Sequence, residues 1–185
     1  MTIGDWFLNY LEGFQVDIIN DENQPVTADI LCGYGDQTEL DNWVARKNDD
    51  GSIKYPLIWI PIERGNSRQS WRIADQSIII LTDSNVTLLN DERFSETYTN
   101  VLWKVWNELY KKLLKSNSFN FTGGNKEEDR YSWLEKPSFG LSNGETIRLS
   151  QNNFVDKKGN KSIVSDVVDA LIIDMKFEIN TTNCN

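Results

Sequence analysis

The chain has 185 residues, with 19 basic and 28 acidic side chains, a net charge of −9 and no histidine. That length suits one domain with an ordinary core, and the negative balance disfavours a dedicated nucleic-acid binder because phosphate backbones repel it. The absence of histidine removes the usual general base, the Ser–His and Cys–His pairs and imidazole metal ligands, so composition argues against an enzyme.

The beginning of the chain lacks the basic and long apolar regions of a secretory signal. No run approaches the roughly 18 apolar residues that a membrane span needs. We therefore expect synthesis in a reducing cytoplasm and no membrane partner. Under these conditions Cys32 is expected to be a small buried apolar residue and Cys184 a tail thiol, with a disulfide between them left open.

The first third of the chain predicts a short helix followed by a hairpin. Apolar residues recur at helical spacing over residues 3–14. Residues 16–19 and 26–32 are typical of two strands joined by a polar turn, and Gly33-Tyr34-Gly35 is expected to end the second strand. Residues 38–47 predict a further short helix.

The middle of the chain predicts strands that are buried on both sides. The run at 55–62 is apolar throughout, with prolines at Pro56 and Pro61, and it indicates the interior of a covered sheet. Two further strands are expected at 71–74 and 77–82, separated by polar residues.

A long helix is predicted next, starting near Asp91 or Ser95 and ending near Lys115. Its apolar side chains cover about twice the width of a stripe that makes one core contact. One edge can cover the sheet, whereas the other needs a second partner. That second edge consists of Trp103, Trp106, Tyr110 and Leu114.

Residues 117–165 are too long for a plain loop and too aromatic for a linker, and they predict an extended arm or long hairpin. The chain then closes with a strand near 167–180 that alternates apolar and polar residues. The expected fold is α+β, with a mixed, mainly antiparallel sheet packed by one long helix and a short N-terminal helix. Residues 1–116 and 166–185 would form the body, and 117–165 the arm.

Acidic residues offer one possible catalytic site. Asp83, Asp91, Glu92 and Glu63 could hold a metal ion if they converged, but their spacing fits no fixed motif and solvated loops are favoured. Gly33-Tyr34-Gly35 lacks the third glycine of a phosphate loop. We therefore expect no catalytic residue, no cofactor and no metal.

Aromatic residues are the better candidates for function, because they dominate interaction hot spots. An ordinary role in the core remains an equally good interpretation for Trp103, Trp106 and Trp133. The predicted subunit-interface residues are Trp103, Trp106, Tyr110, Leu114, Trp133 and Phe139.

Four segments together resemble small structural proteins of tailed bacteriophages. These are Gly33-Tyr34-Gly35-Asp36, the run Tyr55-Pro56-Leu57-Ile58-Trp59, the strand at 77–83 before the long helix, and the strand at 169–179. The chain is similar to the tail-completion, tail-terminator and neck-ring group, in versions from phages of Bacteroidetes-type hosts that include crAss-like phages. The resemblance covers about residues 3–115 and 166–180.

The resemblance implies a non-enzymatic virion subunit that forms a homo-oligomeric ring at the head–tail junction or the tail end. Such a ring would shape the DNA conduit, join head to tail, touch portal, adaptor or tail-tube proteins, and contact the passing genome transiently. Two alternatives remain: a metal-dependent nuclease or hydrolase that uses the acidic residues, and a monomeric adaptor that binds one host protein.

Overall fold

A computed structural model describes residues 1–45, 55–62, 66–68, 71–84, 88–123, 129–137, 139, 154–155, 161–162 and 168–180. Its main sheet contains seven strands, with the path β3-β4-β6-β11-β7; β5 pairs with β6, and β8 pairs with β11. The strands are β3 (Leu31–Gly35), β4 (Leu57–Pro61), β5 (Asn66–Arg68), β6 (Trp71–Asp83), β7 (Phe119–Phe121), β8 (Tyr131–Lys136) and β11 (Val168–Asn180). The predicted α+β class, with a mixed and mainly antiparallel sheet, is confirmed.

The two central strands, β6 and β11, pair antiparallel over their whole length, from Val168 opposite Asp83 to Asn180 opposite Trp71. Their apolar runs are buried because other elements cover both sheet faces there. The strands expected at 71–74 and 77–82 are therefore one continuous strand. The polar residues between them do not interrupt it, since a central ladder pairs every main-chain group whatever the side chain.

The edge strand β3 runs parallel to β4, with Gly33 opposite Trp59. We expected Gly33 and Gly35 to end a strand, and this was wrong. A Cβ atom built at Gly33 would lie 2.7 Å from the Trp59 ring, and one at Gly35 would lie 2.8 Å from it. The glycines therefore let the Trp59 indole pack against the strand backbone.

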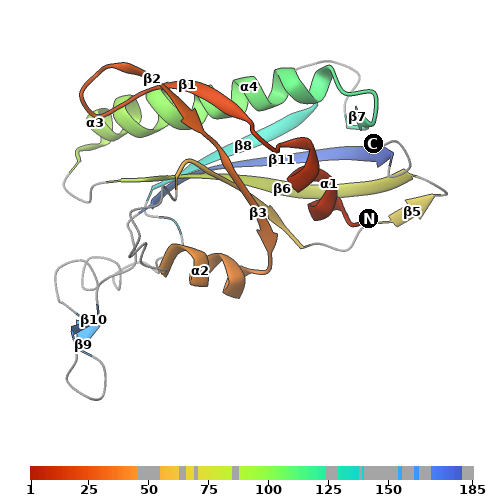
Figure 1. Ribbon diagram of the computed structural model, residues 1–185, viewed down its shortest axis with the longest axis horizontal. Coiled ribbons are helices and arrows are strands. Elements are labelled where there is room, and N and C mark those ends of the chain that lie inside the picture. Colours follow the sequence, from red (N-terminus) through yellow and green to blue (C-terminus); the bar gives the residue numbers. More distant parts are fainter. Residues whose placement is uncertain are drawn as a thin grey trace.

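One face of the sheet carries the N-terminal elements and the long helix (Figure 1). Helix α1 (Ile3–Tyr10) begins at a capping box, in which the Asp5 N–H donates to Thr2 Oγ1 and the Thr2 N–H donates to the Asp5 carboxylate. The hydrogen bond from the Thr2 N–H to the Asp5 carboxylate is the main cause that lowers the pKa of Asp5. The predicted hairpin is confirmed as β1 (Gln15–Ile19) and β2 (Pro25–Asp29), which continue the same layer. Its second strand ends at Asp29 and not at Cys32, because residues 31–35 form β3 and pair with β4.

The predicted long helix is confirmed, and it contains a wide segment. Three consecutive pieces form it: α3 (Asn90–Arg93), the π-helical η1 (Phe94–Leu102) and α4 (Trp103–Leu114). The Trp103 N–H donates to the Tyr98 carbonyl, five residues back. The helix starts before both expected caps. The Glu92 carboxylate accepts the Leu89 N–H at 2.9 Å and so satisfies one of the main-chain donors at this end.

The opposite face is covered by α2 (Gln37–Ala45), where the sequence predicted a short helix (Figure 1). Leu40 is 1% exposed and packs in a cluster with Leu57 and Trp59. Phe139 joins this cluster, and its N–H donates to the Val168 carbonyl at 2.8 Å. The sheet is thus a middle layer, with the larger core on the α4 side.

The segment 117–165 does not leave the body as a single arm, as we expected it to do. Phe119–Phe121 and Tyr131–Lys136 both pair antiparallel with β11 and extend the sheet on its far side from β6. Phe119, Phe121 and Tyr131 of this segment therefore pack in or against the main core. Farther along, β9 (Phe154–Val155) and β10 (Lys161–Ser162) pair with each other and lie away from the sheet in Figure 1.

None of the helices among the described residues is long and apolar enough to cross a membrane. Cys32 is a free thiol that is partly buried in β3, and burial raises its pKa to about 12. Cys184 lies outside the described residues.

Candidate assembly surface

The second edge of the long helix has a partner within the same chain. Trp106 is fully buried and lies 4.9 Å from the Tyr131 ring of β8, centroid to centroid, in an edge-to-face arrangement. Tyr110 also packs against Tyr131, and the Trp103 Nε1–H donates to Glu135 at 2.7 Å. Strand β8 therefore covers most of the helix surface that we expected to be left for another subunit.

Two of the six predicted interface residues are unavailable to a partner. Trp106 is 0% exposed and Phe139 is 8% exposed, because β8 covers the first and the α2 side of the sheet encloses the second. Trp103 and Tyr110 are half-buried. Leu114, at the C-terminal end of α4, remains 46% exposed.

The clearest apolar exposure lies on β8. Trp133 is 55% exposed and Leu134 is 54% exposed. Trp133 is paired with Ile173, whose side chain lies in the core on the α4 side, and Leu134 with Ile172, which packs toward the α2 side. Since neighbouring side chains of a strand point to opposite faces, β8 exposes large apolar side chains on both faces of the sheet.

The outer main-chain edge of β8 is also unpaired among the described strands, because β8 pairs only with β11. The main-chain hydrogen bonds of β11 show which residues of β8 direct their N–H and C=O groups outward. The Thr122 N–H donates to the Lys176 carbonyl, and the Asn180 N–H donates to the Ser118 carbonyl, so even-numbered residues of β11 bond toward β7 and β8.

Even-numbered β11 residues pair with even-numbered β8 residues, such as Ile172 with Leu134. The N–H and C=O groups of Tyr131, Trp133 and Glu135 consequently point away from β11, toward the free edge of the sheet. Natural edge strands are usually short or protected by charge and proline. The charged and proline residues that could protect this edge, Glu135, Lys136 and the following Pro137, all stand at one end of the strand.

The predicted acidic site does not assemble among the described residues. No group of three acidic or cysteine side chains within the described ranges lies close enough to hold a metal ion. Asp83 and Asp91 are exposed, and the Glu92 carboxylate caps the long helix. Glu63 lies outside the described residues.

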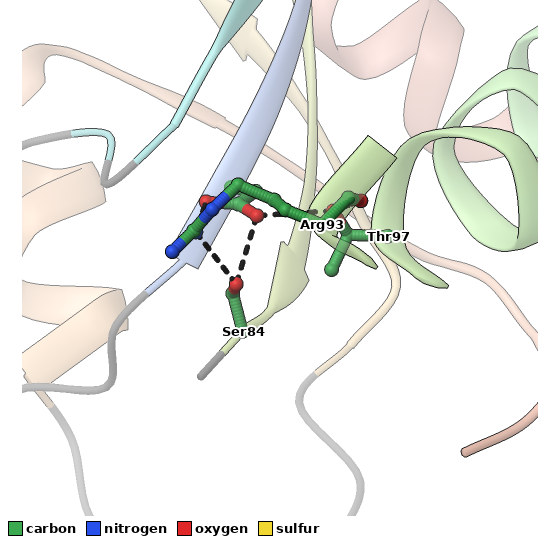
Figure 2. A network of polar contacts seen from close by, with 4 residues as sticks. Ser84, Arg93 and Thr97 are labelled. Atoms are coloured by element: carbon green, nitrogen blue, oxygen red, sulfur yellow. Dashed lines mark hydrogen bonds and ion pairs between the residues drawn. The ribbon is translucent and has the colours of Figure 1, made fainter. Parts of the chain in front are cut away.

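A buried polar cluster that we did not predict fixes the start of the long helix to the sheet (Figure 2). Asp169 is 0% exposed, and its carboxylate accepts hydrogen bonds from Arg93 Nη1 at 2.6 Å and from Ser84 Oγ at 2.8 Å. Thr97 Oγ1 lies 3.0 Å from the same carboxylate. The ion pair satisfies two charges that would otherwise be costly to bury.

This cluster also affects Tyr98, one turn into the π-helical segment. Its pKa is raised mainly by burial, and then by the negative charges of Asp169 and Glu135. A phenol in such surroundings stays protonated at neutral pH. The cluster thus anchors the beginning of the long helix to the end of β6 and the beginning of β11, inside the fold.

An open groove of about 480 Å³ lies between β1 and α4. Its charged side chains occur in both signs, and two of them, Lys111 and Glu108, pair with each other at 2.6 Å. The Asp17 carboxylate accepts a hydrogen bond from Thr27 at 2.6 Å. The groove therefore presents no net charge that would select a ligand.

Sequence reasoning identified Trp133 but missed its neighbour Leu134. The sequence Tyr131-Ser132-Trp133-Leu134 contained the signal. Its aromatic residues alternate as in a strand, and Leu134 adds an apolar side chain on the opposite face. Comparison of the chain with models of protein families, with curated proteins and with solved structures gave no match.

Proposed function

We propose that the protein is a non-enzymatic structural subunit of a tailed-phage virion that assembles into a ring at the head–tail junction or the tail end. In this role it shapes the DNA conduit and joins head to tail, with portal, adaptor or tail-tube proteins as neighbours. The likeness noted in the sequence motivates the place of assembly, and the structure supplies a surface for self-contact.

One observation carries the proposal: β8 is an edge strand with Trp133 and Leu134 more than half exposed on opposite faces. A ligand that covered one face would leave the other side chain in water. A neighbouring subunit that meets the edge covers both, and it also satisfies the outward main-chain groups. Aromatic anchors such as Trp133 are the residue type that contributes most to contacts of this kind.

The net charge of −9 supports a position around passing DNA. An acidic lumen repels the duplex and does not retain it, whereas a basic lumen would bind it in a salt-dependent way. Many soluble proteins are equally acidic, so the charge supports the proposal without carrying it.

The test locates the protein and counts its copies. Particles of a phage whose genome encodes this chain should contain it in fixed stoichiometry, and cryo-EM should place it in a ring at the neck or tail end, with Trp133 against a neighbouring subunit. Purified protein should self-associate in light scattering, and Trp133→Ser should weaken that association.

Two outcomes would contradict the proposal. A one-to-one complex with a host protein, with the chain absent from particles, would support the adaptor alternative. Metal-dependent hydrolysis that Asp83→Ala or Glu92→Ala abolishes would support the enzyme alternative.

A further inference from the structure

We propose that the β8 edge of one subunit pairs with the β3 edge of the next, so that the sheets of neighbouring subunits join. This inference rests on the proposed function, because it names the second of the two different surfaces that a head-to-tail ring contact needs. β3 and β8 lie at opposite ends of the sheet among the described strands. Each has one side with no described strand beside it.

Strand directions require the new pair to be antiparallel when the sheet continues in the same orientation. β8 is antiparallel to β11, which is antiparallel to β6, so β8 and β6 share a direction. β4 is antiparallel to β6, and β3 is parallel to β4. β3 therefore runs opposite to β8, and antiparallel pairing is the more stable kind per residue.

The main-chain groups of β3 that point outward are known from its ladder with β4. The Leu31 N–H donates to the Pro56 carbonyl at 3.0 Å, and the Ile62 N–H donates to the Gly35 carbonyl at 3.0 Å. In a parallel ladder each residue sends both groups to one side. Cys32 and Tyr34 consequently direct their N–H and C=O groups outward, as Tyr131, Trp133 and Glu135 of β8 do.

These groups can meet in two registers, and the ends of the strands select one. Placing Tyr34 opposite Tyr131 would bring Glu135 against Ile30, whose N–H is already bonded to the Phe14 carbonyl. Placing Tyr34 opposite Trp133 brings Pro137 against Ile30.

In that second register, the new ladder ends at Pro137 and Ile30. Pro137 has no N–H to donate, and the Ile30 N–H is already bonded to the Phe14 carbonyl. The usable parts of both edges then have the same length.

Side chains fit this second register. Trp133, 55% exposed, would face Tyr34, 38% exposed, as a cross-strand aromatic pair. On the other face Leu134 would lie over Gly33, which has no side chain to obstruct it. Asp36, an exposed carboxylate directly after β3, would stand opposite Tyr131, and no like charges would be directly opposed.

Cysteine cross-linking tests the register directly. In a background with Cys32→Ser and Cys184→Ser, Leu31→Cys with Lys136→Cys places two thiols at a non-hydrogen-bonded pair, where Cα atoms are about 4.5 Å apart and a disulfide can form. The matched control combines Leu31→Cys with Leu134→Cys, which is the pair expected in the other register and a diagonal pair in this one.

The Leu31/Lys136 pair should give intermolecular disulfides under mild oxidation, at roughly ten times the yield of the control. Mixing the two single-cysteine proteins should give heterodimers, while each alone should stay uncross-linked. A second measurement needs no cysteine: Tyr34→Ser should weaken self-association about as much as Trp133→Ser, although these residues lie at opposite ends of the sheet within one subunit.

Each contrary result overturns the inference. A higher yield in the control contradicts the register, and cross-linking of the Lys136→Cys protein alone reveals a two-fold β8–β8 contact. Absence of cross-links in solution and in purified particles, with an oligomer still present, rules out β3 as the partner but leaves the proposed function standing. Absence of both the oligomer and a virion location removes the two together.

Discussion

Replacing Asp169 by alanine should destabilise the protein far more than removing an exposed partner of a salt bridge. The change leaves the Arg93 guanidinium, with a side chain 8% exposed, buried without the carboxylate that it now contacts at 2.6 Å. Breaking such a pair costs about 3–5 kcal/mol, because the remaining charge stays buried after it has lost the opposite charge. This is a large part of the total stability of an ordinary domain, about 5–15 kcal/mol.

The matched control is Asp75→Ala. Asp75 pairs with Lys176 at 3.1 Å, but the two side chains are 68% and 61% exposed, so solvent screens the interaction and its loss should cost less than about 1 kcal/mol. Urea unfolding followed by circular dichroism measures both variants. With a slope of about 2 kcal/mol per molar urea, the midpoint should fall by about 1.5–2.5 M for Asp169→Ala and by less than about 0.5 M for the control.

A double variant, Arg93→Leu with Asp169→Leu, should be more stable than Asp169→Ala, because it removes both buried charges. If Asp169→Ala lowered the midpoint no further than Asp75→Ala, the cluster would not anchor the long helix to the sheet. If the double variant were the least stable of the set, the hydrogen bonds of the cluster would matter more than its charges.

Three further outcomes follow from packing and burial. Trp106→Ala should cost about 3–5 kcal/mol in urea unfolding. Trp133→Ser should cost about 1 kcal/mol, the scale of an aromatic contact such as that between the Trp133 and Trp103 rings, whose centroids lie 5.3 Å apart, and it should act mainly on the sedimentation of the assembly. Equal stability losses would contradict the assignment of Trp106 to the core and Trp133 to the surface. Gly33→Ala should cost about 1–3 kcal/mol through overpacking against the adjacent indole, and a neutral result would show that the strand shifts freely. The Cys32 thiol, with its pKa raised to about 12, should react with a disulfide reagent at pH 8 much more slowly in the folded protein than in the unfolded protein. The free energy of unfolding should fall as pH rises from about 9 toward 12, because the thiol ionises first in the unfolded chain. Equal labelling rates of the folded and unfolded forms of a Cys184→Ser protein would refute this.

Periodic sequence patterns predicted the elements whose environment is uniform. The alternation from Leu171 to Ile179 matches the alternating burial of β11, because one side of that strand stays in the core along its length. The first hairpin and the long helix were also predicted correctly. Each of these elements has a repeating contact that leaves a repeating signal in the sequence.

The errors arose where tertiary contacts gave residues an unexpected role. Gly33 predicted a break, but the neighbouring Trp59 needs its missing side chain. Trp106 predicted an outer face, but a strand more than twenty residues later covers it. The pairing of Arg93 with Asp169 spans 76 residues, and no local pattern indicates which two of many charged residues will be buried together.

The central claim is that the β8 edge is a contact between subunits. Hydrogen exchange of the amide groups of Tyr131, Trp133 and Glu135, measured at increasing protein concentration, tests it most directly. The claim predicts that exchange at these three positions slows strongly as copies associate, and that Trp133→Ser removes this slowing. Rapid exchange there in the assembled particle, with protection confined to other surfaces, would contradict it.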